Sequence, residues 1–455
     1  MTIKFINFFK SGTMKVRSIL FLTLLPGIVL SSNAQTSPSQ LLKFSLKEAK
    51  DYALKNSPVL MNSARDVEIS RKMIWENTAT GLPQFNVNSS YSYNPQLSGF
   101  TDAIVNFPGM EDLNIDDLKK NFFVSGQVDQ LIFSGAYIVG LKAAQVYANL
   151  SELADTKSKI GIEESITNTY FTALVAKQSS EILDSTLTVI QQTLYQTEQM
   201  FKNGFVEQTD VDQLKILESN IKSNLTLTTR QVAIVERMLK FQMGLPIDEP
   251  VLLTDQIDPL VNIMNLETAI IDSFDLESNV DYNMMQTQEK LRLLNYKLSK
   301  TQFLPTISGY YSFYKSLDDN FFNDQSPNTY GLSLRFPIFS SGLRMSQVKQ
   351  RQLEYQKAQT NRQMGADDLR IQYESALSGF IAARDVYFLQ QENRNLALRI
   401  YRKSIVKFKE GVSGSLDLNT TQQQFFTAEG TYFNALMALV TAKSKLDNLL
   451  TKNVQ

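Results

Sequence analysis

The chain contains two closely related short stretches, "FKNGFVEQTDV" at residues 201–211 and "FKEGVSGSLDL" at residues 408–418. In each, a glycine is followed six positions later by an aspartate, and the pairs Gly204/Gly411 and Asp210/Asp417 both lie 207 positions apart. Glycine readily adopts the left-handed conformation that ends a helix, and an acidic side chain is favoured in the first turn of the next one. The repeated pattern therefore predicts two helical hairpins with tips at 203–210 and 410–417.

The residues on either side of these tips have the composition and spacing of long helices. No proline lies between Pro108 and Pro246 or after Pro337, and a proline inside a helix would remove a hydrogen bond. Apolar residues recur at alternating steps of three and four from Leu418 to Leu449, which is the heptad pattern of helices packed side by side. We expect hairpins over 137–243 and 343–450, whose first helices would each extend roughly 100 Å.

Four segments before the long helices alternate between apolar and polar residues and are predicted to be strands: 84–94, 122–133, 305–315 and 328–338. Their length and alternation are typical of transmembrane β-strands, although a soluble sheet with one wet face has the same pattern. Four strands alone would leave two edges without hydrogen-bond partners in a bilayer, so several chains would have to share one closed barrel. Five tyrosines are candidates for an aromatic belt at the membrane interface, or are ordinary sheet residues: Tyr91, Tyr93, Tyr310, Tyr311 and Tyr330.

The composition argues against catalysis and against nucleic acid as a partner. The 45 basic residues balance the 46 acidic ones, and the 455-residue chain has no cysteine and no histidine. Disulfides, thiol nucleophiles and imidazole metal sites are thereby excluded. We expect no enzyme activity, no cofactor and no metal.

The N-terminus has the features of an export signal. Lys15 and Arg17 precede the apolar run 18–30, and small residues follow up to Ala34. A membrane anchor is the alternative, but about 13 apolar residues fall short of the roughly 20 that a spanning helix needs. We interpret 1–34 as a signal peptide.

With these features, the chain resembles the TolC family of outer-membrane efflux proteins. The resemblance rests on the tip stretches, on "LPQFNV" (82–87) and "LPTISG" (304–309), on "QLIFSGA" (130–136) and "FPIFSSG" (336–342), and on the order and duplication of these motifs. It implies a homotrimer in the outer membrane in which twelve strands close one β-barrel, continued through the periplasm by an α-helical barrel.

The resemblance also implies partners and sites. A periplasmic adaptor protein would contact the tips and couple the duct to an inner-membrane pump of the RND or ABC type, for efflux or type I secretion. The matching tip residues are Gly204, Phe205, Val206, Gly411, Val412 and Ser413, and the acids at the pore entrance are Asp210 and Asp417. Both acids could instead serve only as helix N-terminal carboxylates. Where the family's best-studied pattern has a base and a second acid, this chain has Ser413 and Thr420, which puts a salt-bridge latch in doubt.

These observations divide the chain into a signal peptide (1–34), a first repeat (35–250), a connecting segment (251–275) and a second repeat (276–455). The expected fold class is mostly α with a membrane β part. A structural coiled-coil scaffold or adhesin without a channel is the alternative function. The transported substrate and the class of pump stay open.

Overall fold

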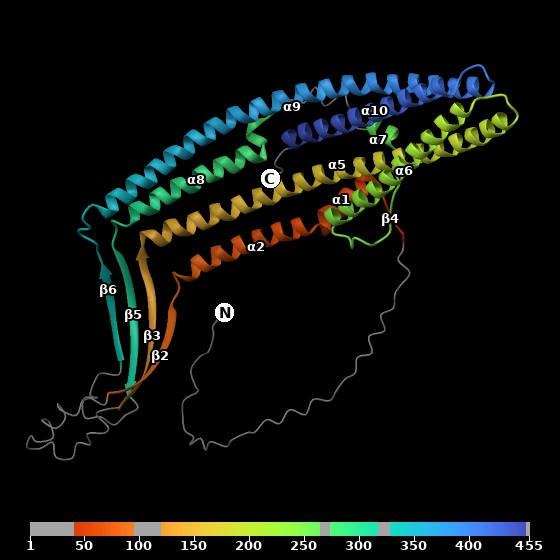
Figure 1. Ribbon diagram of the computed structural model, residues 1–455. Helices are drawn as coiled ribbons and strands as arrows, with labels where there is room; N and C mark the ends of the chain where they lie inside the picture. Colours follow the sequence, from red (N-terminus) through yellow and green to blue (C-terminus); the bar gives the residue numbers. More distant parts are fainter. Residues whose placement is uncertain (1–40, 95–119, 264–273, 317–327, 452–455) are drawn as a thin grey trace, which may run out of the picture. The chain divides into compact units, whose positions relative to one another are not determined.

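A computed structural model describes residues 41–94, 120–263, 274–316 and 328–451. The signal peptide predicted at 1–34 lies outside these ranges. Within them the chain repeats one plan twice: a helix, two strands, a long helix, a tip and a returning helix (Figure 1). The fold class predicted from the sequence, mostly α with a β part, is confirmed.

The first repeat comprises β1 (Leu42–Phe44), α1 (Leu46–Asn56), α2 (Pro58–Ala79), β2 (Gln84–Tyr93), β3 (Lys120–Ser134), α5 (Gly135–Lys202) and α6 (Gln208–Met243). The connection contains β4 (Val251–Leu253) and α7 (Ile257–Ile263). The second repeat comprises η3 (Leu276–Ser278), α8 (Val280–Thr301), β5 (Thr306–Ser316), β6 (Asn328–Arg335), α9 (Leu343–Lys409) and α10 (Ser415–Leu450).

The four long strands form one antiparallel sheet in the order β2-β3-β5-β6, so β2 and β6 are its outer strands. Strands β2, β3 and β5 end within two residues of the predicted limits. Strand β6 ends at Arg335, and the predicted extension to Ile338 is wrong. Pro337 supplies the reason, because proline has no N–H for a strand ladder and restricts the residue before it.

The helices pack side by side along the long helices α5 and α9. Helix α2 contacts α5, α5 contacts α8, and α8 contacts α9; further along, α5 packs against α6 and α10, and α9 against α10 (Figure 1). Each short helix therefore covers only part of a long one, and a second helix covers the rest. Helix α10 has neighbours in both hairpins, whereas α6 packs mainly on α5.

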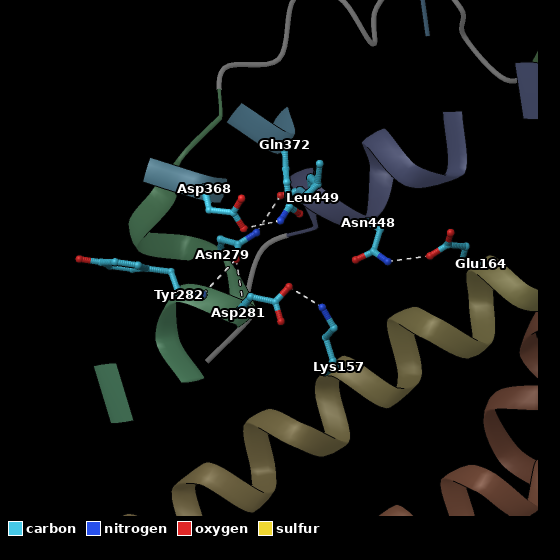
Figure 2. A network of polar contacts seen from close by, with 9 residues as sticks. All are labelled: Lys157, Glu164, Asn279, Asp281, Tyr282, Asp368, Gln372, Asn448 and Leu449. Carbon is cyan, nitrogen blue, oxygen red and sulfur yellow. Dashed lines mark hydrogen bonds and ion pairs between the residues drawn. The ribbon is translucent and has the colours of Figure 1, made fainter. Parts of the chain in front are cut away.

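The ends of the short helices meet beside the long ones. Gly244, the left-handed residue that ends α6, lies so close to the link between α1 and α2 that an added Cβ would be 2.2 Å from the carbonyl oxygen of Asn56 and 3.2 Å from Pro58. In the second repeat, Asn279 caps α8 and its Nδ2 donates to the carbonyl oxygen of Leu449 near the end of α10 (3.1 Å; Figure 2). In both repeats, therefore, the end of the returning helix (α6 or α10) meets the start of the short helix (α2 or α8).

Polar contacts join the second junction to α5. Lys157 forms an ion pair with Asp281, and Asn448 Nδ2 donates to Glu164 Oε2 at 2.7 Å (Figure 2). These contacts tie the start of α8 and the end of α10, which are far apart in the sequence, to one helix of the first repeat.

A short parallel strand pair, which the sequence analysis does not predict, ties the connection to the first repeat. Strand β1 pairs with β4, and Asp255 just after β4 accepts hydrogen bonds from the N–H of Leu46 (2.7 Å) and the hydroxyl of Tyr170 (3.1 Å). The buried core around this pair includes residues of α1, α5, α6, α9 and α10. A second apolar cluster fills the space between α5, α6, α9 and α10 nearer the tips.

Candidate functional site

The two hairpin tips have the same backbone structure. Gly204 and Gly411 have φ of 73° and 69°, so the left-handed conformation predicted for both is confirmed. In the first tip, the N–H of Phe205 donates to the oxygen of Met200 (3.0 Å) and that of Gly204 to Phe201 (2.9 Å), which is a Schellman motif. The second tip has the equivalent bonds from Val412 to Lys407 (2.8 Å) and from Gly411 to Phe408 (3.0 Å).

Each tip exposes a large apolar side chain directly after its glycine. Phe205 is 76% exposed and Val412 74%. The neighbouring Val206 and Ser413 are half-buried. Large exposed apolar side chains at the end of a hairpin suit contact with another protein better than contact with water. The adaptor-contact role of the tip residues stays a prediction.

The two tip acids lie in different surroundings. Asp210, in the first turn of α6, is half-buried and accepts hydrogen bonds from the hydroxyl of Ser415 (2.5 Å) and the N–H of Glu207 (3.4 Å). Asp417, in the first turn of α10, is exposed, and its carboxylate has no partner in the described part of the chain. Asp210 therefore joins the two hairpins, while Asp417 is available to ions in solution; the pore-entrance role of both stays a prediction.

Ser415 is a contact residue that the sequence analysis missed. It is 4% exposed, and its hydroxyl lies within hydrogen-bond distance of both Asp210 and Gln213 Oε1 (2.7 Å) on α6. The available signal was a heptad line on α10, in which Ser415, Gln422 and Glu429 are spaced by seven and all three are buried. The tip motif itself does not indicate which residues of this heptad line are buried.

The last turns of α9 form a basic surface that was also missed. Its five members are exposed and form no ion pair with any described residue: Arg399, Arg402, Lys403, Lys407 and Lys409. Only Lys407 and Lys409 lie in the last turn of α9, where the negative end of the helix dipole favours a positive charge. The positions 207 residues earlier are nearly uncharged: Gln192, Tyr195, Gln196, Met200 and Lys202. The positive charge is thus particular to the second hairpin.

The strand register divides the five candidate tyrosines between two faces of the sheet. Tyr311 is opposite Tyr330 and Tyr91 is opposite Phe122, and these three tyrosines lie on the apolar face together with Tyr93, two residues after Tyr91. Tyr310 is opposite Asp129 and Gly331 and lies on the polar face, and the interfacial role of the five tyrosines stays a prediction. The division follows from the alternation of side chains along a strand, which sends neighbours to opposite faces. The Tyr310 ring fills the space above Gly331, where an added Cβ would be 2.7 Å from the tyrosine oxygen.

The described residues contain no group of three or more acidic side chains placed to hold a metal ion. No helix in the described ranges combines the length and the apolar composition needed to cross a membrane. The tips present exposed apolar, basic and acidic side chains in separate places.

Comparison with known protein families gives a match over part of the chain. Residues 275–452, which cover the second repeat up to its last three residues, match the family of outer membrane efflux proteins. This match confirms the resemblance to the TolC family over the second repeat and supports a location in the outer membrane that extends into the periplasm. Comparison with curated protein sequences gives no match.

Solved structures of outer-membrane channels have the same fold. VceC of Vibrio cholerae is 14% identical with a TM-score of 0.67, over 90% of this chain and 97% of that one. CmeC of Campylobacter jejuni is 16% identical with a TM-score of 0.70, over 89% and 85%. The open-state MtrE channel of Neisseria gonorrhoeae is 16% identical with a TM-score of 0.67, over 89% and 88%.

Proposed function

We propose that three copies of this chain form one exit duct, in which twelve strands close a β-barrel in the outer membrane and the helices form a barrel through the periplasm. The duct passively conducts substrates that an inner-membrane transporter of the RND or ABC type delivers. A periplasmic adaptor protein contacts the tips and joins the two, in a tripartite efflux or type I secretion system. The protein itself catalyses no reaction.

The open sheet is the observation that carries this proposal. Among the described residues, its outer strands β2 and β6 each have a neighbour on one side only, and one face is lined by apolar residues such as Val87, Tyr91 and Leu332. In a bilayer, unpaired peptide groups are tolerated only if the sheet closes on itself. Four strands per copy require more than one copy, because the smallest membrane barrels have about eight strands. The number three comes from the resemblance to the TolC family, which implies a homotrimer.

The helices support the same assembly. Large apolar side chains are exposed along helices at both edges of the helical layer. They include Ile69 and Trp75 on α2, Ile216 and Ile234 on α6, and Met364, Ile371 and Val386 on α9. Exposed apolar stripes on opposite edges would be covered if α9 of one copy packed against α2 and α6 of the next.

The division of the chain at 250 and 275 belongs to the same proposal. Helix α6 and the left-handed Gly244 end the first repeat, and the 3-10 turn η3 begins the second. Only β4 and α7 are described between them. Each repeat would thus supply one strand pair and one hairpin to the duct.

Conductance in planar bilayers tests the proposal. The wild-type protein should give stable currents that favour cations, and Asp417→Ala should lower the cation-to-anion permeability ratio by about threefold, since each lost carboxylate contributes a fraction of a kcal/mol in water. Asp367→Ala, which removes an exposed acid remote from the tip, is the matched control. A scaffold or adhesin would give no current at all, and that result would refute the duct.

A further inference from the structure

Three aromatic side chains lie among small polar ones on the polar face of the sheet. The strand register places Phe123 of β3 and Tyr310 and Tyr314 of β5 on this face, where most other side chains are hydroxyls and amides. Among the described strand residues, the register places only two charged ones there, Asp129 and Arg335. Apolar groups gathered on a wet surface often mark a place where another molecule binds.

The three rings occupy two levels along the sheet. The rings of Phe123 and Tyr314 are in contact, with centroids 5.3 Å apart and planes tilted by 31°. The Tyr310 ring lies above Gly331 of β6, and Tyr310 keeps an exposed fraction of 36%. Tyr310 and Tyr314 are four residues apart on one strand, which separates the two levels by roughly 13 Å. A solute that moves along this face meets aromatic rings twice.

The repeat within the chain supplies a counterpart for each tyrosine position. The Leu-Pro pairs before β2 and β5 lie 222 positions apart (304 − 82), so Asn88 and Ser92 correspond to Tyr310 and Tyr314. Both counterparts are exposed on the same face of the sheet. Strand β2 therefore forms with no aromatic ring on its polar face.

The phenylalanine position has a counterpart as well. Ile132 and Ile338 of the two matching motifs lie 206 positions apart (338 − 132), so Thr329 of β6 corresponds to Phe123 of β3. Thr329 is exposed, and β6 also has no aromatic ring on its polar face. The two inner strands thus hold all three rings, while the outer strands form the same ladder without them. The strand fold itself does not require these rings.

We propose that Phe123, Tyr310 and Tyr314 form an aromatic contact site inside the duct for uncharged solutes with a flat apolar ring. This inference rests on the proposed function, in which the polar face of the sheet lines the water-filled interior of the barrel. Flat rings pack on aromatic side chains in offset or edge-to-face arrangements. Three copies of the chain would place three such sites around one passage.

The charge of the face supports an uncharged solute. One acid and one base per copy cancel, and Asp129 accepts a hydrogen bond from Nε2 of Gln127 at 2.8 Å. The site therefore attracts neither anions nor cations by net charge. A few aromatic contacts are weak, so the site slows a passing ring without retaining it.

Current block in planar bilayers tests the site in the full-length protein. Caffeine, an uncharged flat double ring, should reduce the current of the wild-type channel in a saturable way. Sorbitol, an uncharged open chain, should reduce it only in proportion to its concentration. Tyr314→Ser and Phe123→Thr give each position the residue type of its counterpart. Each variant should raise the half-blocking concentration of caffeine about threefold, through the loss of one aromatic contact.

The neighbouring tyrosine on the opposite face is the control. Tyr311→Leu removes a ring from the apolar face and should leave the half-blocking concentration unchanged. Equal block in the wild type and in both site variants would overturn the proposal and would mean that the ring pair only stabilises the sheet. Block by caffeine that is no stronger than that by sorbitol would overturn it too. A wild-type protein without any current would instead refute the duct.

A fluorescence measurement tests the site without any current and keeps a ring at the position. Trp75 is the single tryptophan, so Trp75→Phe combined with Tyr314→Trp places one indole in the proposed site. Caffeine should quench this indole with a saturable dependence on concentration. In the matched protein, Trp75→Phe with Tyr311→Trp, quenching should rise in simple proportion to concentration. Proportional quenching of both proteins would overturn the aromatic site, whether or not the duct conducts.

Discussion

Gly204 and Gly411 show how a single residue type sets the length of a helix. Their left-handed backbone lets the glycine N–H and the N–H of the next residue bond carbonyls of the last helical turn, which would otherwise have no partner. No other atom lies within 4 Å of a Cβ added at either glycine. The requirement for glycine is therefore conformational and not steric.

Alanine at either position should destabilise the tip by about 1–2 kcal/mol, the cost of the left-handed conformation for a residue with a Cβ. Because the tips are far from the main core, we expect faster proteolysis next to Lys202 in Gly204→Ala and next to Lys409 in Gly411→Ala. Gly430→Ala is the control, since Gly430 lies inside α10 and also has free space around it. That variant should be as stable as the wild type or up to about 1 kcal/mol more stable.

At the scale of helices, α9 and α10 are held in register by a buried ion pair. Arg394 Nε donates to Glu429 at 2.8 Å, and its guanidinium group lies 4.9 Å from the centre of the Tyr432 ring. The Glu429 side chain is 6% exposed. Burial, the largest single effect, would lower the pKa of Arg394, but the hydrogen bonds to Glu429 and the attraction of Glu429, Tyr432 and Asp258 together outweigh it, and the pKa is raised. The arginine stays charged, so the pair depends on both partners.

Removing the acid should therefore be costly. Glu429→Ala leaves a buried, unpaired guanidinium group and should lower the free energy of unfolding of the hairpin by about 3–5 kcal/mol. Asp385→Ala removes an acid that pairs with Arg384 but is 63% exposed, and should cost less than about 1 kcal/mol. Thermal and denaturant unfolding of both variants checks the difference. Equal losses would mean that burial of the pair does not matter.

At the scale of the whole molecule, the outer strands β2 and β6 and the exposed apolar stripes of the helices indicate which surfaces of neighbouring copies would be in contact. If β2 of one copy pairs with β6 of the next, single cysteines placed along the two strands should form disulfides between copies. The absence of native cysteine makes every such bond unambiguous.

We expect a scan that combines Ser90→Cys with cysteines at 329, 331 and 333 to give one strongly cross-linked register and a ladder ending at trimers on denaturing gels. Ser90→Cys alone is the control and should stay monomeric on the same gel. Cross-linking that stops at dimers, or that is absent at every register, would contradict the shared barrel.

The repeated tips, the long helices and the strand alternation could be predicted from the sequence because each depends on residues close together in the chain. Gly204 specifies its turn through its own backbone, and the heptads from Leu418 to Leu449 specify a helix face through local spacing. The two faces of each strand are local information too, because neighbours such as Tyr310 and Tyr311 point to opposite faces of the sheet.

Contacts between distant segments were decided only by the tertiary structure. The pairing of β1 with β4, the contact of Ser415 with Asp210, and the burial of Gln422 all depend on which helix lies next to which. Lys215 and Gln422 occupy the same place in the repeat, yet one is exposed and the other enclosed, because α6 lies at an edge and α10 packs against both hairpins. Periodicity specifies a helix face, whereas its neighbours follow from packing across the whole chain.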